Sequence, residues 1–181
     1  LPIYEKRFMA DWQSMEESIK DSDINLNDLF TMYEYYLLAS NPKKSLTEEL
    51  QDLFKDRDSN EVISKIKEFA RIYKKEIFDT ESKIIFSLRY LRWSMYWKTI
   101  VMTAFLEKYK HMEELLKELR RFYYLYWIAG KTLTQIKQVS FNVIRAIKED
   151  KHINYLKAIF NKASYFERLF SLNTPKNNDL S

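Results

Sequence analysis

Residues 82–109 read SKIIFSLRYLRWSMYWKTIVMTAFLEKY, and towards the end of this stretch apolar residues fall on nearly every side of the helix that it predicts. A surface helix carries one apolar stripe, whereas a helix that is apolar all round is buried. We therefore expect one buried helix from 81 to 109, with other helices packed around it. Its uncharged run, 99–106, is far shorter than the ~18–20 apolar residues that span a bilayer, so no membrane segment is expected.

The rest of the chain also predicts helices. It contains one Gly and three Pro in 181 residues, which removes most means of forming tight turns and hairpins. Ser45 followed by Glu48 is a capping-box pattern, and Asn25 or Asn27 can cap the helix before it. We predict an all-α fold, an irregular multi-helix bundle of about eight helices. The other seven are expected at 8–20, 28–40, 45–57, 58–78, 110–129, 134–149 and 153–170.

Charge divides the chain into two halves. Residues 1–90 carry 14 Lys or Arg against 18 Asp or Glu, and residues 91–181 carry 16 against 8. We expect one helical domain over 1–172, with an acidic half at 1–90 and a basic half at 91–172. The tail 173–181 is polar and is expected to be disordered. A basic half can follow nucleic-acid phosphates, although a charged, solvated helical surface is the alternative interpretation.

The start of the chain and its cysteine content bear on its context. It begins LPIYEKRF, with no initiator Met and no signal-peptide pattern, so we expect a fragment of a longer protein. It has no cysteine, which excludes a disulfide framework and a thiolate metal site. A cysteine-free chain without a signal peptide favours a cytoplasmic location.

Residues for catalysis or cofactor binding are scarce. A chain with one glycine cannot form a phosphate-binding loop or a dinucleotide fingerprint. His111 and His152 are far apart in sequence, and neither has a His partner at helical spacing, so no metal site is expected. Acidic pairs such as Glu113-Glu114 lie beside Lys or Arg and indicate solvated ion pairs. We predict no catalytic residue, metal or cofactor in this segment, although the parent protein could be an endonuclease.

The stretch ELLKELRRFYYLYWIAGK, residues 114–131, combines basic and aromatic residues. Exposed rings beside arginine form platforms for unpaired bases, but the helical spacing of these rings places most of them in a core. The residues predicted to bind nucleic acid are Arg120, Arg121, Lys131, Lys137 and Arg145. Tyr124 and Trp127 are predicted to lie on an exposed face or edge, where they could form a protein interface.

Several stretches occur in an order that resembles the helical region of GmrSD-type modification-dependent restriction proteins. These stretches are MADWQSMEESI, INLNDLFTMYEYYLL, LTEELQDLFKD, ISKIKEFARIYKKEI and LLKELRRFYYLYWIAGK. The shared signals are a Trp in the first helix, Phe54-Lys55 at the end of a helix, Ala70 with Tyr73, and an aromatic run before Gly130. The resemblance covers most of the chain.

The resemblance implies a place between other domains. In that family a ParB-like domain with a D-G-Q-Q-R motif precedes the helical region, and an HNH-type nuclease domain often follows it. This chain has neither a D-G-Q-Q-R run nor clustered His and Asn, so no family catalytic residue can be assigned to it. We expect a non-catalytic module of a restriction or phage-defence protein that positions flanking domains, with possible DNA contacts. The alternative is a protein-binding helical adaptor, and either module could form a homodimer.

Overall fold

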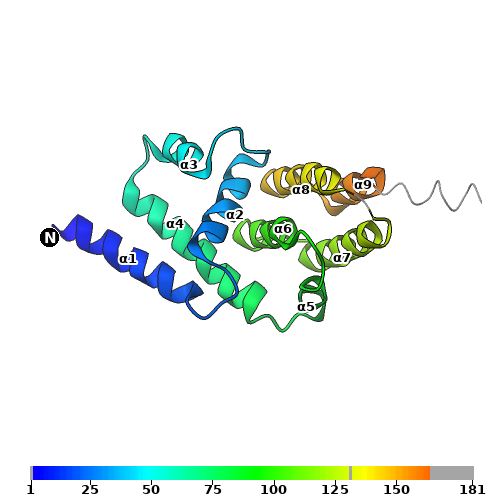
Figure 1. Cartoon of the computed structure of the whole chain (residues 1–181), viewed down its shortest axis with the longest axis horizontal. Helices are drawn as coiled ribbons and strands as arrows, with labels where there is room; N and C mark the ends of the chain where they lie inside the picture. Colours follow the sequence, from blue (N-terminus) through cyan, green and yellow to red (C-terminus); the bar gives the residue numbers. More distant parts are fainter. Residues whose placement is uncertain (1, 131, 164–181) are drawn as a thin grey trace, which may run out of the picture.

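The computed structural model describes residues 2–130 and 132–163, and these residues form helices joined by short loops, with no strand (Figure 1). The all-α prediction is confirmed. In chain order the elements are α1 (Ile3–Ile19), α2 (Leu26–Leu38), α3 (Leu46–Phe54), α4 (Ser59–Ile72), the π-helical segment η1 (Tyr73–Phe78), α5 (Lys83–Leu88), α6 (Ser94–Leu106), α7 (Met112–Ile128), α8 (Leu133–Lys148) and α9 (Ile153–Ala163). The predicted continuation to 170 and the predicted tail 173–181 lie outside the described residues.

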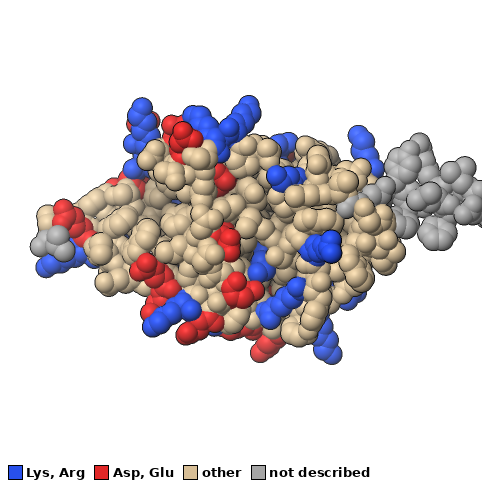
Figure 2. Space-filling model, in the orientation of Figure 1, with Lys and Arg blue, Asp and Glu red and all other residues tan. Residues whose placement is uncertain are grey.

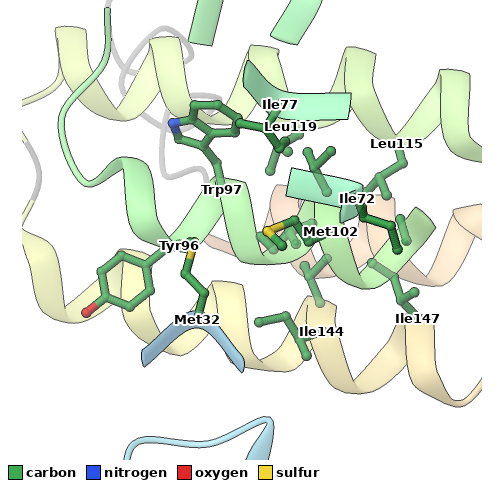
Figure 3. Close-up of a cluster of buried hydrophobic side chains, with 14 of the residues drawn as sticks. Met32, Ile72, Ile77, Tyr96, Trp97, Met102, Leu115, Leu119, Ile144 and Ile147 are labelled. Carbon is green, nitrogen blue, oxygen red and sulfur yellow. The ribbon is translucent and has the colours of Figure 1, made fainter. Parts of the chain in front are cut away.

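Helix α6 lies at the centre of the fold. Every residue from Tyr96 to Ala104 is buried, as the all-round apolar pattern predicts. The surrounding side chains come from five other elements, and Figure 3 shows one from each: Met32, Ile72, Ile77, Leu119 and Ile144. The hydroxyls of Thr99 and Thr103 are satisfied because they donate to the carbonyls of Met95 and Thr99. No helix among the described residues has both the length and the hydropathy to cross a bilayer.

The prediction of one helix over 81–109 is wrong, because the chain breaks between α5 and α6. Trp93 adopts a left-handed conformation with φ 61°, which a non-glycine residue rarely adopts. The Arg89 guanidinium donates to the carbonyls of Ile77 and Phe78, the last residues of η1. These bonds hold the start of the turn against η1. No Gly or Pro marks this break, so the sequence pattern alone did not reveal it.

Side-chain caps mark the starts of α2, α3, α4 and α5. The Asn25 side chain accepts the Asp28 N–H, and the Ser45–Glu48 capping box is complete. Asp58 accepts the Glu61 N–H at 2.9 Å and so caps α4. The first helix begins at Ile3 rather than at the predicted Phe8. Its core contacts begin at Phe8, and the turn before Phe8 extends the helix without packing on the core.

The helices form two groups on either side of α6. In Figure 1, α1 to α4 lie on the left and α7 to α9 on the right, and α1 packs along α4. One cluster of buried apolar side chains runs from Met15 in α1 to Phe160 in α9, so the groups share a core. Helix α3 adds no buried residue to this shared core. The left-hand group therefore keeps partly exposed apolar surface beside α3.

A polar triad joins the loop after α1 to η1 and α6. The side chain of Lys98 is only 9% exposed, and its ammonium donates to the Tyr73 hydroxyl at 2.7 Å and to the Asp23 carboxylate at 3.2 Å. The Tyr73 hydroxyl donates to the other Asp23 oxygen at 2.5 Å. A buried cation is tolerated only with such partners. The triad thus compensates for a lysine in the most buried helix.

The triad shifts the titration of its carboxyl group. Burial alone would raise the pKa of Asp23, but the hydrogen bond from Tyr73 and the charge of Lys98 outweigh it, so the pKa lies below its ordinary value of 3.8. A carboxyl whose pKa is lower in the folded chain stabilises the fold above its unfolded pKa of about 3.9. That contribution is lost as the pH falls through the folded value.

We predict that Asp23→Asn lowers the free energy of unfolding at pH 7 by about 1–2 kcal/mol, because it removes the counter-charge of Lys98 but water screens the exposed part of the site. Urea denaturation at pH 7 and at pH 2 measures the effect. The difference from wild type should shrink at pH 2, because wild-type Asp23 also loses its charge as the pH falls through its lowered pKa.

Asp21→Asn is the matched control, since Asp21 is exposed in the same loop and pairs with none of the described residues. It should leave the free energy of unfolding nearly unchanged. Equal stability of wild type and Asp23→Asn at pH 7 would contradict a stabilising triad, and so would a deficit that persists in full at pH 2.

Candidate nucleic-acid interface

The outward face of α7 brings several of the predicted functional residues together. Lys117, Arg120, Arg121, Tyr124 and Trp127 recur at a spacing that places them on one side of the helix. The opposite side is the core side, and its residues are buried: Leu115, Leu116, Leu119, Phe122, Tyr123 and Tyr126. This division confirms that most rings of the stretch are core residues. It leaves a basic and aromatic strip on the surface, named here the α7 strip.

Arg120 differs from the other two cations of the α7 strip because it has no partner among the described residues. It is exposed, and no described residue forms a hydrogen bond or an ion pair with it. Lys117, one turn earlier, is engaged with Glu113 at 2.6 Å in an exposed pair of the kind that contributes little to stability. Lys117 was not among the residues predicted from the sequence. Both cations can therefore reach an external anion at little cost to the fold.

Arg121 is more constrained than Arg120. Its Nε donates to Glu118 at 3.0 Å, and another guanidinium nitrogen donates to the Asn161 side chain of α9 at 2.5 Å. These bonds connect α7 to α9 and partly neutralise the charge. Arg121 thus contributes to the positive character of the surface, but binding an external anion would require it to share or exchange partners.

The aromatic end of the α7 strip lies against α5. The Tyr124 hydroxyl donates to the Ser87 carbonyl at 3.3 Å, and its ring meets Trp127 edge-on with centroids 6.5 Å apart. Tyr124 is half-buried, whereas Trp127 is 54% exposed. Helix α5 and the turn after it also expose two rings, Phe86 and Tyr90. The sequence prediction missed these two rings because they are distant from Trp127 along the chain.

The charge around the α7 strip is mainly positive. Residues 83–92 contain three Lys or Arg and no Asp or Glu. Residues 117–128 contain three Lys or Arg against one Glu, and the first turn of α7 before them carries Glu113 and Glu114. On the face drawn in Figure 2, acidic side chains lie mainly over the left and lower parts, whereas the right-hand part, where α7 to α9 lie, shows mainly Lys and Arg. On this face, the charge division of the sequence therefore corresponds to a division in space.

Arg145, another predicted nucleic-acid residue, lies at a different place. Its guanidinium donates to the Ala39 carbonyl at 2.9 Å, and Lys148 donates to the carbonyls of Tyr36 and Leu37 at 2.8 and 3.0 Å. Cations at a helix C-terminus satisfy its free carbonyls and favour its dipole. Burial lowers the pKa of Lys148, and the charge of Glu107 partly offsets this. Arg145 and Lys148 therefore cap α2.

The remaining predicted residues do not extend the α7 strip. Lys137 is half-buried on α8, a helix that packs on α6 and α9, and none of the described residues pairs with its ammonium. Lys131 lies outside the described residues. The structure thus brings together Arg120, Arg121, Tyr124 and Trp127, and it places Arg145 at the end of α2. Whether any of them binds nucleic acid stays a prediction.

The two histidines meet in space, although 40 residues separate them in the sequence. The ring centroids of His111 and His152 are 4.6 Å apart, and His111 Nδ1 lies 3.4 Å from a Glu114 oxygen. Each histidine precedes a helix, and α7 and α9 pack side by side in parallel, as the Glu114–Lys157 and Arg121–Asn161 contacts show. Within the described ranges, no three His, Cys, Asp or Glu residues are grouped so as to hold a metal ion.

Comparisons with known proteins do not suggest a function for this chain. No model of a protein family matches the chain. Searches of curated proteins and of solved structures gave no significant match either. The resemblance to the helical region of GmrSD-type proteins therefore stays a prediction that rests on the sequence stretches quoted above.

We predict that Arg145→Gln lowers the free energy of unfolding by about 1 kcal/mol, because the last carbonyls of α2 lose a charged donor. Thermal and urea denaturation measure this effect. Arg120→Gln is the control and should leave stability nearly unchanged, since Arg120 has no partner among the described residues. If the two variants were equally stable, the capping role of Arg145 would be wrong.

Proposed function

We propose that this chain is a non-catalytic helical module of a bacterial restriction or phage-defence protein of the GmrSD type. In this proposal it holds flanking domains at a fixed separation, and the α7 strip adds sequence-independent contacts to nucleic-acid phosphates. The observation that carries the binding part is the exposed Arg120 guanidinium, unpaired within the described ranges, in a surface that is mainly positive. The domain context rests on the sequence resemblance alone.

The scaffolding part is supported by the way in which the helices pack. A module that sets the distance between two domains must resist bending, and a closely packed core resists deformation. The buried cluster runs without interruption from α1 to α9, so the two groups of helices are joined through α6. Forces applied at one end would therefore be transmitted to the other end.

The non-catalytic part is supported by the structural roles of the polar clusters. Lys98, Tyr73 and Asp23 satisfy one another, and Arg89 and Arg145 bind carbonyls at the ends of helical segments. Catalytic groups instead converge on a pocket with perturbed pKa values and space for a substrate. The proposal accordingly assigns no catalytic residue and no cofactor to this segment.

The binding mechanism would be electrostatic. Lys and Arg that contact phosphates release condensed counterions, so the association constant falls as salt rises, with a slope of ~0.9 per phosphate on duplex DNA. Three contacts, for example from Lys117, Arg120 and Arg121, would lower the association constant about forty-fold between 50 and 200 mM salt. Such contacts position a partner on the nucleic acid but do not read its sequence.

We predict that Arg120→Glu weakens binding to a labelled 20-base-pair duplex about tenfold at 50 mM salt, because it removes one phosphate contact and adds a repelling charge. The logarithmic salt slope should also fall by about one unit. Fluorescence anisotropy over a series of salt concentrations measures both quantities. Arg71→Glu is the matched control, since Arg71 is an exposed arginine of α4 whose one ion pair within the described part of the chain is with Glu68, at 3.6 Å.

Two results would contradict the binding part. One is no binding by the wild-type chain at the lowest salt, and the other is an equal loss for Arg71→Glu and Arg120→Glu, which would indicate an effect of net charge alone.

A protein-binding adaptor is the second candidate function, and one observation favours it. Trp127 and Ile128 are 54% and 68% exposed at the end of α7, and Leu133 at the start of α8 is 38% exposed. Exposed tryptophan is typical of interface hot spots. A chain that dimerises in size-exclusion chromatography, without binding DNA at low salt, would favour the adaptor.

A further inference from the structure

A cleft opens between α1, α2, α3 and α4. These helices lie on the other side of α6 from α7 (Figure 1). Its volume is about 260 Å³. The residues that matter for its chemistry are Phe8, Trp12, Phe30, Phe54, Val62 and Arg57. Five of these six side chains are apolar and half-buried, so water still reaches the walls. The cleft is therefore an apolar surface that the fold leaves partly uncovered.

Aromatic rings form much of the cleft walls. Trp12 stacks with Phe8 and with Phe30, at centroid distances of 6.3 and 6.2 Å and interplanar angles of 24° and 28°. These three rings form a ladder that connects α1 to α2. Phe54 of α3 and Val62 of α4 complete the lining. Aromatic walls favour a flat ring, which can stack or meet them edge-on.

Helix α3 explains why the cleft stays open. Its apolar residues lie on one face, yet none of them is buried. Among the other elements, α3 makes extensive contacts only with α2. It therefore does not close over the cleft between α1 and α4. A molecule that filled this space would remove apolar surface from water on several helices at once, which is favourable.

Arg57 supplies a positive charge beside the apolar walls. It is exposed, and none of the described residues accepts a hydrogen bond from its side chain or pairs with it. Two of the nearby carboxylates are engaged elsewhere: Asp58 accepts the Glu61 N–H and the Tyr4 hydroxyl, and Glu61 pairs with Lys65 at 2.6 Å. Asp56, which precedes Arg57, is exposed and forms no ion pair with Arg57. The guanidinium is thus available to an anion held in the cleft.

We propose that this cleft binds a small aromatic carboxylate, with its ring between the aromatic walls and its carboxylate on Arg57. Arginine and carboxylate pair through two parallel hydrogen bonds, which fixes orientation as well as charge. Engineered apolar cavities of about 150 Å³ hold benzene, so the cleft has room for a molecule of one or two rings. An apolar site with one well-placed polar group is typical of small-molecule pockets.

Binding is tested on the intact chain with three probes. These are 2-naphthoate, the neutral 2-naphthamide and the non-aromatic cyclohexanecarboxylate, each titrated by isothermal calorimetry at low salt. We expect 2-naphthoate to bind about tenfold more tightly than the amide, because only the acid forms a charge-assisted pair. Cyclohexanecarboxylate should also bind more weakly than 2-naphthoate, because it lacks a flat ring.

The variants separate the charge from the cleft. Arg57→Gln should remove the preference for the acid over the amide while amide binding is retained, and its exposure means that the fold should tolerate it. Lys55→Gln, a neighbouring exposed lysine outside the cleft, should keep the full preference. A preference that survives Arg57→Gln would overturn the proposal, as would equal binding of acid and amide. Equal binding of the two acids, or no binding of 2-naphthoate at millimolar concentration, would also overturn it.

Discussion

The burial of α6 on every side is the constraint on which the rest of the structure depends. Tyr96 to Ala104 expose almost no surface to water, so other elements must cover each side of the helix. Helices α2, α4, α7 and α8, together with η1, provide this cover. Each of them turns an apolar face towards α6, and its polar residues lie on the side that stays exposed to water. The way in which these helices cover α6 therefore determines which of their residues face the solvent and are available for binding.

The same constraint determines which cations are free. Lys98 lies inside the fold and requires Tyr73 and Asp23 as partners. Arg145 and Lys148 donate to carbonyls at the end of α2. These side chains have structural roles, although a count of charges treats them like any other basic residue. The basic half of the chain therefore offers fewer free cations than its composition suggests, and Arg120 is the clearest of them.

Much of the fold could be predicted, because the signals for helix starts and for buried faces are local. The capping box at Ser45 and the inward side of α7 depend only on neighbouring residues. The break at Trp93 could not be predicted, because bonds from Arg89 to distant carbonyls hold the turn. The approach of His111 to His152 depends on the parallel packing of two helices, and the capping role of Arg145 depends on where α2 ends. For the candidate interface, helical spacing distinguished the exposed rings of α7 from the buried ones. It could not predict that Phe86 of α5 and Tyr90 of the following turn would also be exposed.

Native-state hydrogen exchange tests the central role of α6 most directly. If α6 is held on all sides, the amides of residues 96–104 should exchange only when the whole chain unfolds, at the free energy that urea denaturation gives. The amides of α3, which has no buried residue, should exchange at a much lower free energy. Exchange of α6 at the free energy of α3, well below that of global unfolding, would contradict the account.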